Sequence, residues 1–247
     1  MSEDDFFKLP RLFVDAPLGQ DADITLSAEQ AHYFKTVLRR QDGDQVRLFN
    51  GRDGEWLCAL ASLGKKDGTA TALRRLKDQP VNPPRVHLFF APIKKSRLDW
   101  LVEKAVELGA TDLHPVVTQN TEIREVNEKR LKQQIFEAAE QCERLDLPVL
   151  HPLIKLQSVA DHLPAGTAFF ACLERGETKL LDALLDALPG NQDVAVLIGP
   201  EGGFTAAEAS WIFGHENWRA SSLGPRILRC ETAICAALTA IMLHQSA

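Results

Sequence analysis

Two glycine-containing loops near the end of the chain, each preceded by an apolar run, constrain its fold most strongly. The first loop, Gly199-Pro-Glu-Gly-Gly203-Phe204, follows the run Val194–Ile198, and the second extends from Leu223 to Thr232. Short β-branched runs that end at turn residues are typical of buried strands. Glycine has no Cβ, so it lets the backbone approach a ligand closely and adopt positive φ. We therefore expect two strand-to-loop junctions that form the floor of a cofactor site, although one such loop alone is equally compatible with a plain turn.

The C-terminal two thirds of the chain alternate between strand and helix patterns. Predicted strands cover 86–91, 113–117, 168–173 and 194–198, and predicted helices cover 98–108, 128–142, 180–188, a segment opening at Thr205 and 232–245. This alternation predicts an α/β domain with a mostly parallel sheet covered on both faces. The last helix is apolar nearly all round, so we expect it to be buried inside the domain or in a dimer interface.

The N-terminal part shows a different pattern. Short segments with partial period-two patterning cover 12–14, 45–49, 55–60 and 69–76, and Asn50-Gly51 supplies a turn between the second and third. Ser27 and Gln30 form a capping-box pattern ahead of a helix over 28–38. Residues 79–84 contain three prolines and interrupt both helix and sheet. The expected domains are a small β-barrel over 1–78, a linker over 79–84 and the α/β domain over 85–247.

Composition excludes several classes of protein. Hydrophobic residues make up 45% of the 247 residues and charged residues 25%, which is ordinary globular usage. No run approaches the ~20 apolar residues of a membrane helix, and Met1–Asp5 is acidic, unlike a signal peptide. We expect a cytoplasmic protein with no membrane partner. The five cysteines show no C-x-x-C pair, which supports neither a disulfide framework nor a metal site; they are Cys58, Cys142, Cys172, Cys230 and Cys235.

The charge is unevenly distributed along the chain. The net charge of −6 disfavours nucleic acid, because Lys and Arg supply most non-specific affinity for phosphates. However, Lys35–Lys77 holds ten basic and five acidic residues, a net of +5, whereas Leu131–Ala247 holds eight and fourteen, a net of −6. The basic N-terminal part is compatible with RNA binding or with an ordinary solvated face.

Common nucleotide and hydrolase motifs are missing. The first glycine loop is not G-x-G-x-x-G and lies late in the chain, which disfavours a nicotinamide dinucleotide site. The sequence contains no P-loop and no G-x-S-x-G elbow, so the commonest nucleotide-hydrolysis and serine-hydrolase functions are excluded.

Taken together, the segments of this chain resemble the SPOUT-class methyltransferases, and within them the uridine-N3 methyltransferases of small-subunit ribosomal RNA (the RsmE family). The resemblance lies in Arg11–Val14, His32–Arg39, Asp99–Gly109, Glu137–Gln141 and the two glycine loops. It implies a C-terminal α/β domain with a trefoil knot and a PUA-like β-barrel before it. It also implies S-adenosylmethionine as cofactor, N3 of a uridine in 16S ribosomal RNA as substrate, and a homodimer whose sites are completed across the interface.

The resemblance carries the cofactor lining over to particular positions. An apolar pocket with a few convergent backbone donors suits a purine, although each aliphatic residue taken singly is equally compatible with core packing. Cys230 is expected to be a packing residue rather than a nucleophile. The expected cofactor-binding residues are Leu173, Ile198, Gly199, Pro200, Glu201, Gly202, Gly203, Leu223, Gly224, Ile227, Leu228, Arg229 and Thr232.

Methyl transfer to uridine N3 requires removal of the N3 proton while negative charge spreads onto the flanking carbonyl oxygens, so positioning and electrostatics should dominate. Arg229, Arg226 and Arg124 are candidates to stabilise that charge or to grip phosphate, with Arg229 nearest the transfer. The alternative role for Arg226, which is less favoured, is a salt bridge with Glu201 or Glu231. Glu201 accepts the proton or caps the following helix.

The same resemblance assigns RNA contacts and reveals one departure. Arg11, His32, Arg39 and Arg40 of the barrel, with Arg97 and Arg226, are expected to contact RNA. The family usually carries an arginine where this chain has Asn120, so either Arg124 substitutes for it or that contact is weaker here.

Three other hypotheses remain open at the level of sequence. A SPOUT enzyme acting on another RNA position would share the cofactor loops. A catalytically silent RNA-binding assembly factor would not bind S-adenosylmethionine. A metabolic α/β enzyme would have no affinity for ribosomal RNA.

Overall fold

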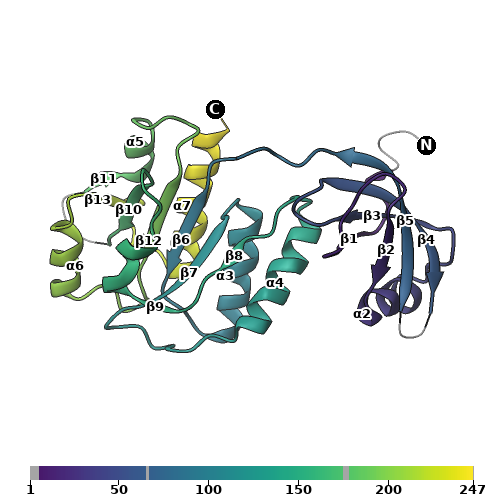
Figure 1. Cartoon of the computed structure of the whole chain (residues 1–247). Coiled ribbons are helices and arrows are strands. Elements are labelled where there is room, and N and C mark those ends of the chain that lie inside the picture. The colour runs from purple at the N-terminus through teal and green to yellow at the C-terminus, as the bar shows by residue number, and fades with distance from the viewer. Residues whose placement is uncertain (1–5, 65–66, 175–177, 247) are drawn as a thin grey trace. The chain divides into compact units, whose positions relative to one another are not determined.

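The computed structural model describes residues 6–64, 67–174 and 178–246; the acidic segment 1–5 lies outside the described residues. The chain forms two compact units, whose elements are labelled in Figure 1. Unit 1 comprises Met1–Asn82 and Ala139–Leu147, and unit 2 comprises Pro83–Ala138 and Pro148–Ala247. No helix in the described ranges has the length and apolar character needed to cross a membrane.

Unit 1 is built on a five-stranded sheet with the order β1-β3-β4-β5-β2. Its strands are β1 (Arg11–Phe13), β2 (Asp23–Leu26), β3 (Gln45–Phe49), β4 (Glu55–Leu63) and β5 (Gly68–Lys77). β1 pairs with β3 in parallel, and the other pairs are antiparallel. The sequence pattern did not predict β2, because a four-residue strand carries too little periodicity to be recognised without its partner β5.

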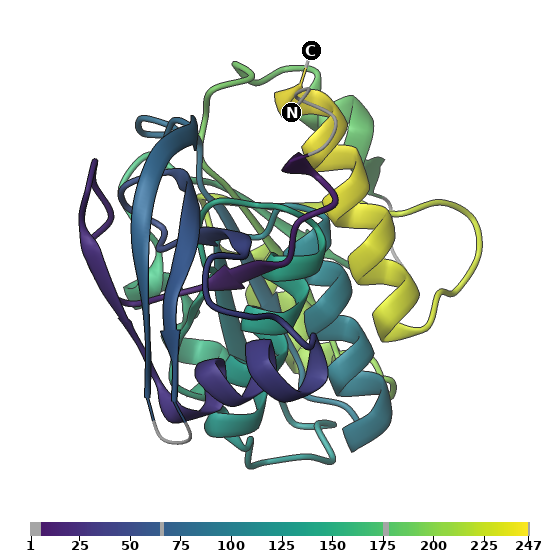
Figure 2. The ribbon, with the colours of Figure 1, turned by 90° about the vertical axis from the view of Figure 1, so that its right-hand side faces the viewer.

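The predicted capping box before the first helix is confirmed. The Ser27 hydroxyl accepts from the Gln30 N–H at 3.2 Å, and the Gln30 side chain accepts from the Ser27 N–H at 2.8 Å. The helix α2 (Ala28–His32) then widens into a π-helical turn, η1 (Tyr33–Val37), where a regular α-helix was expected. Figure 2 shows this helical segment across one end of the strands of unit 1.

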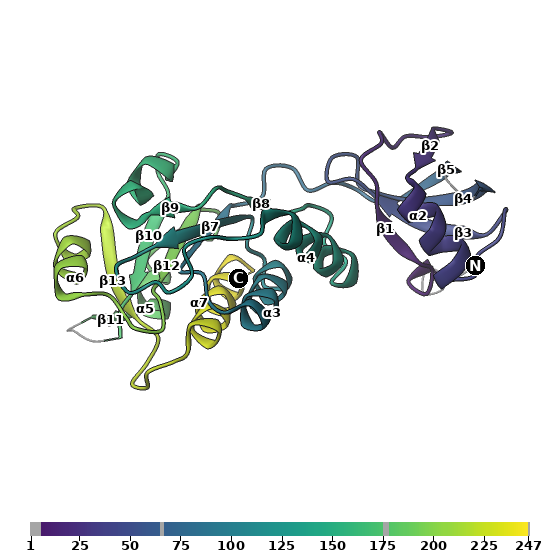
Figure 3. The ribbon, with the colours of Figure 1, turned by 90° about the horizontal axis from the view of Figure 1, so that it is seen from below.

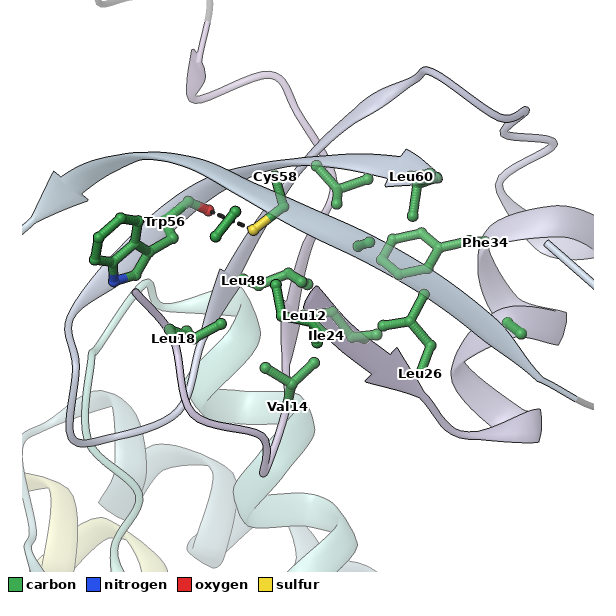
Figure 4. Close-up of a cluster of buried hydrophobic side chains, with 14 of the residues drawn as sticks. Leu12, Val14, Leu18, Ile24, Leu26, Phe34, Leu48, Trp56, Cys58 and Leu60 are labelled. Carbon is green, nitrogen blue, oxygen red and sulfur yellow. Dashed lines mark hydrogen bonds between the residues drawn. The ribbon is translucent and has the colours of Figure 1, made fainter. Parts of the chain in front are cut away.

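The core of unit 1 lies between this helical segment and the sheet. Phe34 points from η1 into the cluster toward Leu26 and Leu60 (Figure 4). Deletion of one large side chain from such a core costs roughly 2–5 kcal/mol. The buried cluster consists of Leu12, Val14, Leu18, Ile24, Leu26, Ala31, Phe34, Val46, Leu48, Trp56, Cys58, Leu60, Leu63, Ala70 and Ala72.

A buried ion network that includes Arg11 also stabilises unit 1. Arg11 is 9% exposed, and its Nε donates to Glu55 Oε1 at 2.7 Å. The same guanidinium donates to the carbonyls of Ala139 (2.8 Å) and Arg144 (2.7 Å) near the end of helix α4 (Glu128–Gln141). Nε, Nη1 and Nη2 of Arg11 thus all donate to protein groups, and a role of Arg11 in contacting RNA stays a prediction.

Unit 2 is built on a parallel sheet with the order β11-β13-β10-β12-β6-β7-β8, and β9 also pairs with β7. The predicted α/β class with a mostly parallel sheet is confirmed. The strands are β6 (Val86–Phe90), β7 (Asp112–Val117), β8 (Val149–Leu150), β9 (Ile154–Lys155), β10 (Ala168–Cys172), β11 (Lys179–Leu180), β12 (Val194–Ile198) and β13 (Trp218–Ser222).

Helices cover both faces of this sheet. The helices α3 (Lys95–Glu107), α5 (Leu181–Leu185) and α7 (Cys230–Gln245) pack together on one face, as Figure 3 shows. On the other face, α6 (Ala206–Phe213) and the 3-10 segment η2 (Leu156–His162) share a core with the alternate strand residues. Gly109 ends α3 at φ 90°, as the pattern predicted.

Histidines form a second buried polar cluster, at β6 and β7. His87 Nδ1 lies 3.2 Å from His114 Nε2, and the ring of His114 stacks on that of His151 at 3.9 Å. The potential ligand atoms of His87, Asp112 and His114 lie within 4.8 Å of one another. However, the Arg85 guanidinium donates to Asp112 Oδ2 at 2.6 and 3.0 Å. The Arg85 guanidinium is thus bonded to Asp112 Oδ2, the oxygen that a metal ion at this cluster would coordinate. We therefore interpret the cluster as a hydrogen-bonded network.

This cluster should make unit 2 sensitive to acid. Burial lowers the pKa of His114 to about 3, and burial also lowers the pKa of His87. The unfolded chain therefore binds more protons once the pH falls below about 6.5, and stability declines from there toward pH 3 by at most about 1.4 kcal/mol per pH unit for each histidine. Urea unfolding of unit 2 between pH 7.5 and 4.5 measures this slope. A His114→Gln variant should show a shallower slope, whereas His32→Gln, at an exposed position of unit 1, should keep the wild-type slope; equal slopes in all three proteins would contradict the prediction.

Candidate functional site

The candidate site lies where three neighbouring parallel strands of unit 2 end. β10 lies between β13 and β12, and Cys172 is paired with both Ser221 and Ile198. Because the carboxyl ends of parallel strands meet at one edge of a sheet, the loops that follow them surround a common space. That space is a pocket of about 340 Å³.

Nearly all of the expected cofactor-binding residues line this pocket. The exceptions are Arg229 and Thr232, which lie at the start of α7 and outside the lining. Other residues that were not expected to bind the cofactor also line the pocket; among them, Cys172 and Glu174 lie at the end of β10, where the sequence shows no glycine motif. These additional residues are Cys172, Glu174, Phe204, Ala209, Ser222, Arg226, Cys230 and Ala233.

The backbone of the first loop requires glycine at particular positions. Gly203 has φ 66°, a conformation that side chains rarely adopt, and its N–H donates to the Pro200 carbonyl at 2.9 Å. A Cβ on Gly199 would lie 2.7 Å from the Phe204 ring. In the second loop Gly224 has φ 112° and faces open space. The two loops therefore present bare backbone to the pocket.

The chemical character of the pocket is mixed. Leu173, Ile198 and Leu228 supply apolar walls, while the loop backbones and Glu174 supply polar groups. This combination, at a volume within the usual range of roughly 300–1,000 Å³, fits a ligand with one aromatic, apolar part and one polar part. Burial raises the pKa of the Cys172 and Cys230 thiols to about 12, so both stay protonated, and Cys230 packs as expected.

Glu201 forms an ion pair at the rim of the pocket. Arg97 of α3 donates with both terminal nitrogens to its carboxylate, Nη2 at 3.0 Å from Oε2, and Arg97 Nη1 lies 3.7 Å from Glu231. The hydrogen bond from Arg97 holds the pKa of Glu201 below its usual value, which disfavours Glu201 as a proton acceptor at neutral pH. Glu201 does not cap α6: Thr205 and Glu208 form that capping box.

The arginines predicted to act in catalysis occupy different places. Arg226 is exposed and lines the pocket, and Arg97 takes the ion pairs with Glu201 and Glu231 that were considered for Arg226. Arg229 is exposed at the N-cap of α7, beside the lining residues Leu228 and Cys230. Arg124 Nη2 donates to the Gln119 carbonyl at 3.3 Å and does not line the pocket.

Comparison with known proteins gives the family. A family model of the RNA methyltransferase domain matches residues 80–242, and a model of the RNA methyltransferase PUA domain matches residues 26–73. A ribosomal RNA small subunit methyltransferase E from Rickettsia conorii is 33% identical over 96% of both chains. The chain belongs to this methyltransferase family. A relative of the same name from Synechocystis is 34% identical over 97% of this chain and 79% of its own.

Solved structures support the assignment to this family. The methyltransferase E from Neisseria gonorrhoeae, solved bound to S-adenosylmethionine, has a TM-score of 0.84 at 26% identity and covers 95% of this chain and 97% of its own. A putative methyltransferase from Legionella pneumophila, solved in complex with the same cofactor, has a TM-score of 0.83 at 27% identity, with coverage of 96% and 98%. The expected SPOUT-type α/β fold with an N-terminal PUA-type domain is confirmed.

Within the PUA-type domain of this methyltransferase, the remaining RNA-contact candidates lie near the helical segment. His32 and Arg39 are exposed, and Arg39 has φ 54° just after the π-helical turn. Arg40 is half-buried, with its Nε buried and without a hydrogen-bond partner among the described residues. His32, Arg39 and Arg40 stay predictions as RNA contacts.

Proposed function

We propose that this methyltransferase transfers a methyl group from S-adenosylmethionine (SAM) to N3 of a uridine in 16S ribosomal RNA, within the small ribosomal subunit. The observation that carries the proposal is the pocket at the ends of β10, β12 and β13, whose walls include most of the residues predicted to bind the cofactor. Membership of the methyltransferase E family and the resemblance to uridine-N3 methyltransferases support the choice of substrate.

The residues present fit this cofactor. Leu173, Ile198 and Leu228 would hold the adenine, and the bare backbone at Gly199 and Gly224 would accommodate the ribose and the methionine part. When bound, SAM supplies a methyl group on a positively charged sulfur. The protein must then orient the uridine ring in line with that methyl group and exclude water around it.

Arginine supplies the electrostatic part of the proposed mechanism. As the N3 proton leaves, negative charge develops on the two carbonyl oxygens of the uracil ring. A guanidinium is always protonated, and its planar fork donates two hydrogen bonds to such oxygens, so it stabilises this charge without losing its own proton. No hydrogen bond is found between the Arg229 side chain and another described residue, which supports this role for its guanidinium, whereas Arg226, which lines the pocket, would grip the RNA.

Gly199→Ala should weaken SAM binding roughly tenfold or more. The added Cβ would lie 2.7 Å from Cε2 and 2.9 Å from Cζ of Phe204, so the ring must move, and that ring lines the pocket. Isothermal titration of both proteins with SAM measures the change. Gly190→Ala is the matched control, because its added Cβ would meet nothing closer than 3.5 Å. Equal affinity of wild type and Gly199→Ala would reject this placement of the cofactor.

We also propose a cytoplasmic homodimer with the partner subunit covering the pocket edge. Ile227 lines the pocket yet is 64% exposed, and Leu243 on α7 is 61% exposed. Exposed apolar side chains, such as Ile227 at the pocket and Leu243 near the far end of α7, are typical of a surface that a protein partner covers. These residues support the dimer that the resemblance implies, and sedimentation measures the oligomeric state.

The site of modification tests the function directly. A methyl group at uridine N3 removes the N–H that pairs with adenine, so it blocks reverse transcriptase. Unmodified small subunits incubated with the protein and SAM should acquire one new stop in 16S RNA, one nucleotide before a uridine, and the stop should be absent without SAM. A methyl group incorporated without a stop at a uridine would assign the enzyme to another RNA position.

A further inference from the structure

Asn120, which stands where the family usually has arginine, contacts the first glycine loop directly. Its Nδ2 donates to the Gly202 carbonyl at 3.1 Å and to the Gly203 carbonyl at 3.0 Å. A Cβ on Gly202 would lie 3.2 Å from Asn120 Cβ, so the loop and this side chain are already in close contact. Both glycines line the pocket, but Asn120 itself does not.

The segment that carries Asn120 is fixed at both ends of its turn. The Thr121 hydroxyl accepts from the Thr118 N–H at 2.8 Å, and the two hydroxyls lie 2.9 Å apart. The Gln119 N–H donates to Glu208 Oε1 at 2.8 Å, and the other carboxylate oxygen of Glu208 accepts from the Thr205 N–H at 2.9 Å. Asn120 therefore projects from a turn that is tied to the start of α6.

The two hydrogen bonds fix the direction of two successive peptide planes. A trans peptide is planar, so its C=O and N–H point to opposite sides. With the Gly202 carbonyl directed at Asn120, the Gly203 N–H points the other way, where it donates to the Pro200 carbonyl at 2.9 Å. The turn is thus fixed from outside by Asn120 and from inside by Pro200.

We propose that Asn120 is a positioning residue for the methyl donor: it holds the Gly202–Gly203 turn in the one conformation that leaves the pocket open to SAM. The inference rests on the proposed function for the identity of the ligand. The effect of Asn120 on the conformation of the turn does not depend on that identity. Gly203 has φ 66°, and a glycine turn without external contacts samples many conformations. Asn120 therefore acts by removing that freedom before the donor binds, which lowers the ordering cost of binding.

Two substitutions of Asn120 distinguish the loss of its two hydrogen bonds from the effect of an added negative charge. Asn120→Leu removes both donors without adding charge, and Asn120→Asp removes them and directs a carboxylate at two carbonyls. Gln119→Leu and Gln119→Glu are the matched controls one residue away, because the Gln119 side chain makes no hydrogen bond with another described residue. Asn120 and Gln119 are both exposed, so the four variants should fold like the wild type.

Hydrogen exchange of the ligand-free protein is measured first. Both Asn120 variants should exchange the Gly203 amide roughly tenfold faster than wild type, because two hydrogen bonds that each contribute modestly are lost. Titration should then show a SAM dissociation constant raised roughly tenfold, with kcat at saturating SAM within about twofold of wild type. The Gln119 variants should match wild type in all three measurements.

Each alternative result has a definite meaning. If both Asn120 variants exchange the Gly203 amide at the wild-type rate, the claim that Asn120 fixes the conformation of the turn is rejected. Faster exchange with unchanged SAM affinity would overturn the positioning role, and so would a fall in kcat alone. If the wild type binds no SAM, the proposed function fails, while the exchange measurement still decides whether Asn120 fixes the loop.

Discussion

Arg229→Ala is expected to reduce kcat for methyl transfer roughly 100- to 1,000-fold, which is the usual cost of removing a donor that stabilises developing oxyanion charge. Arg229 is exposed at the N-cap of α7, beside residues that line the pocket, and its side chain makes no hydrogen bond with another described residue. Its truncation therefore removes no side-chain hydrogen bond, only a weak electrostatic interaction with the exposed Glu201, and the melting temperature should change little. Single-turnover transfer to unmodified small subunits at saturating SAM measures the effect.

A second arginine of unit 2 provides the control for lost charge. Arg219 is exposed on β13 and does not line the pocket, so Arg219→Ala removes the same charge without touching the proposed site. Arg229→Lys keeps the charge but loses the planar fork, and its rate should lie between those of wild type and Arg229→Ala. Turnover by Arg229→Ala at the wild-type rate would reject the role of Arg229.

Glu55→Ala should destabilise unit 1 by about 3–5 kcal/mol, because removal of one partner from a buried ion pair leaves the other charge uncompensated. Glu55 is fully buried, and its carboxylate accepts from Arg11 at 2.7 Å and from Arg47 at 3.5 Å. Burial lowers the pKa of Arg11, against the raising effect of Glu55, so loss of Glu55 leaves a cation where it is least favourable. Urea unfolding followed by the fluorescence of Trp56, which is buried in this unit, measures the change.

An exposed ion pair of unit 1 provides a comparison for this loss of stability. Arg75 donates to Asp78 at 3.0 Å with side chains 51% and 85% exposed, so Asp78→Ala should cost less than about 1 kcal/mol. Similar losses in Glu55→Ala and Asp78→Ala would show that the buried network contributes no more than a surface pair.

The elements with strong local patterns could be predicted from the sequence. The strand over Val194–Ile198 and the helix ending at Gly109 were located to within a few residues, since an apolar run or a 3.6-residue period marks each of them. The two-residue strands β8, β9 and β11 were not, because they exist only through pairing with longer neighbours. The trefoil knot is a property of chain threading that no local pattern encodes, and it stays a prediction.

The candidate site, like the fold, could be predicted from the sequence only in part. Glycine loops after apolar strands predicted the backbone that lines the pocket, because the motif is contiguous in sequence. The partners of single side chains were not predictable, since they lie far apart: Arg97 and Glu201 are separated by 104 positions, and Arg11 and Ala139 by 128. Arg11 is an example, because the resemblance suggested an RNA contact for it and no local pattern indicated its buried partner Glu55.

The claim that the loops after β10, β12 and β13 form the methyl-donor site is tested most directly by isothermal titration of the purified protein with SAM. We predict saturable binding of one SAM per chain, weakened roughly tenfold or more in Gly199→Ala and unchanged in Gly190→Ala. Absence of binding by the wild-type protein, or binding that is indifferent to Gly199→Ala, would contradict this assignment of the pocket.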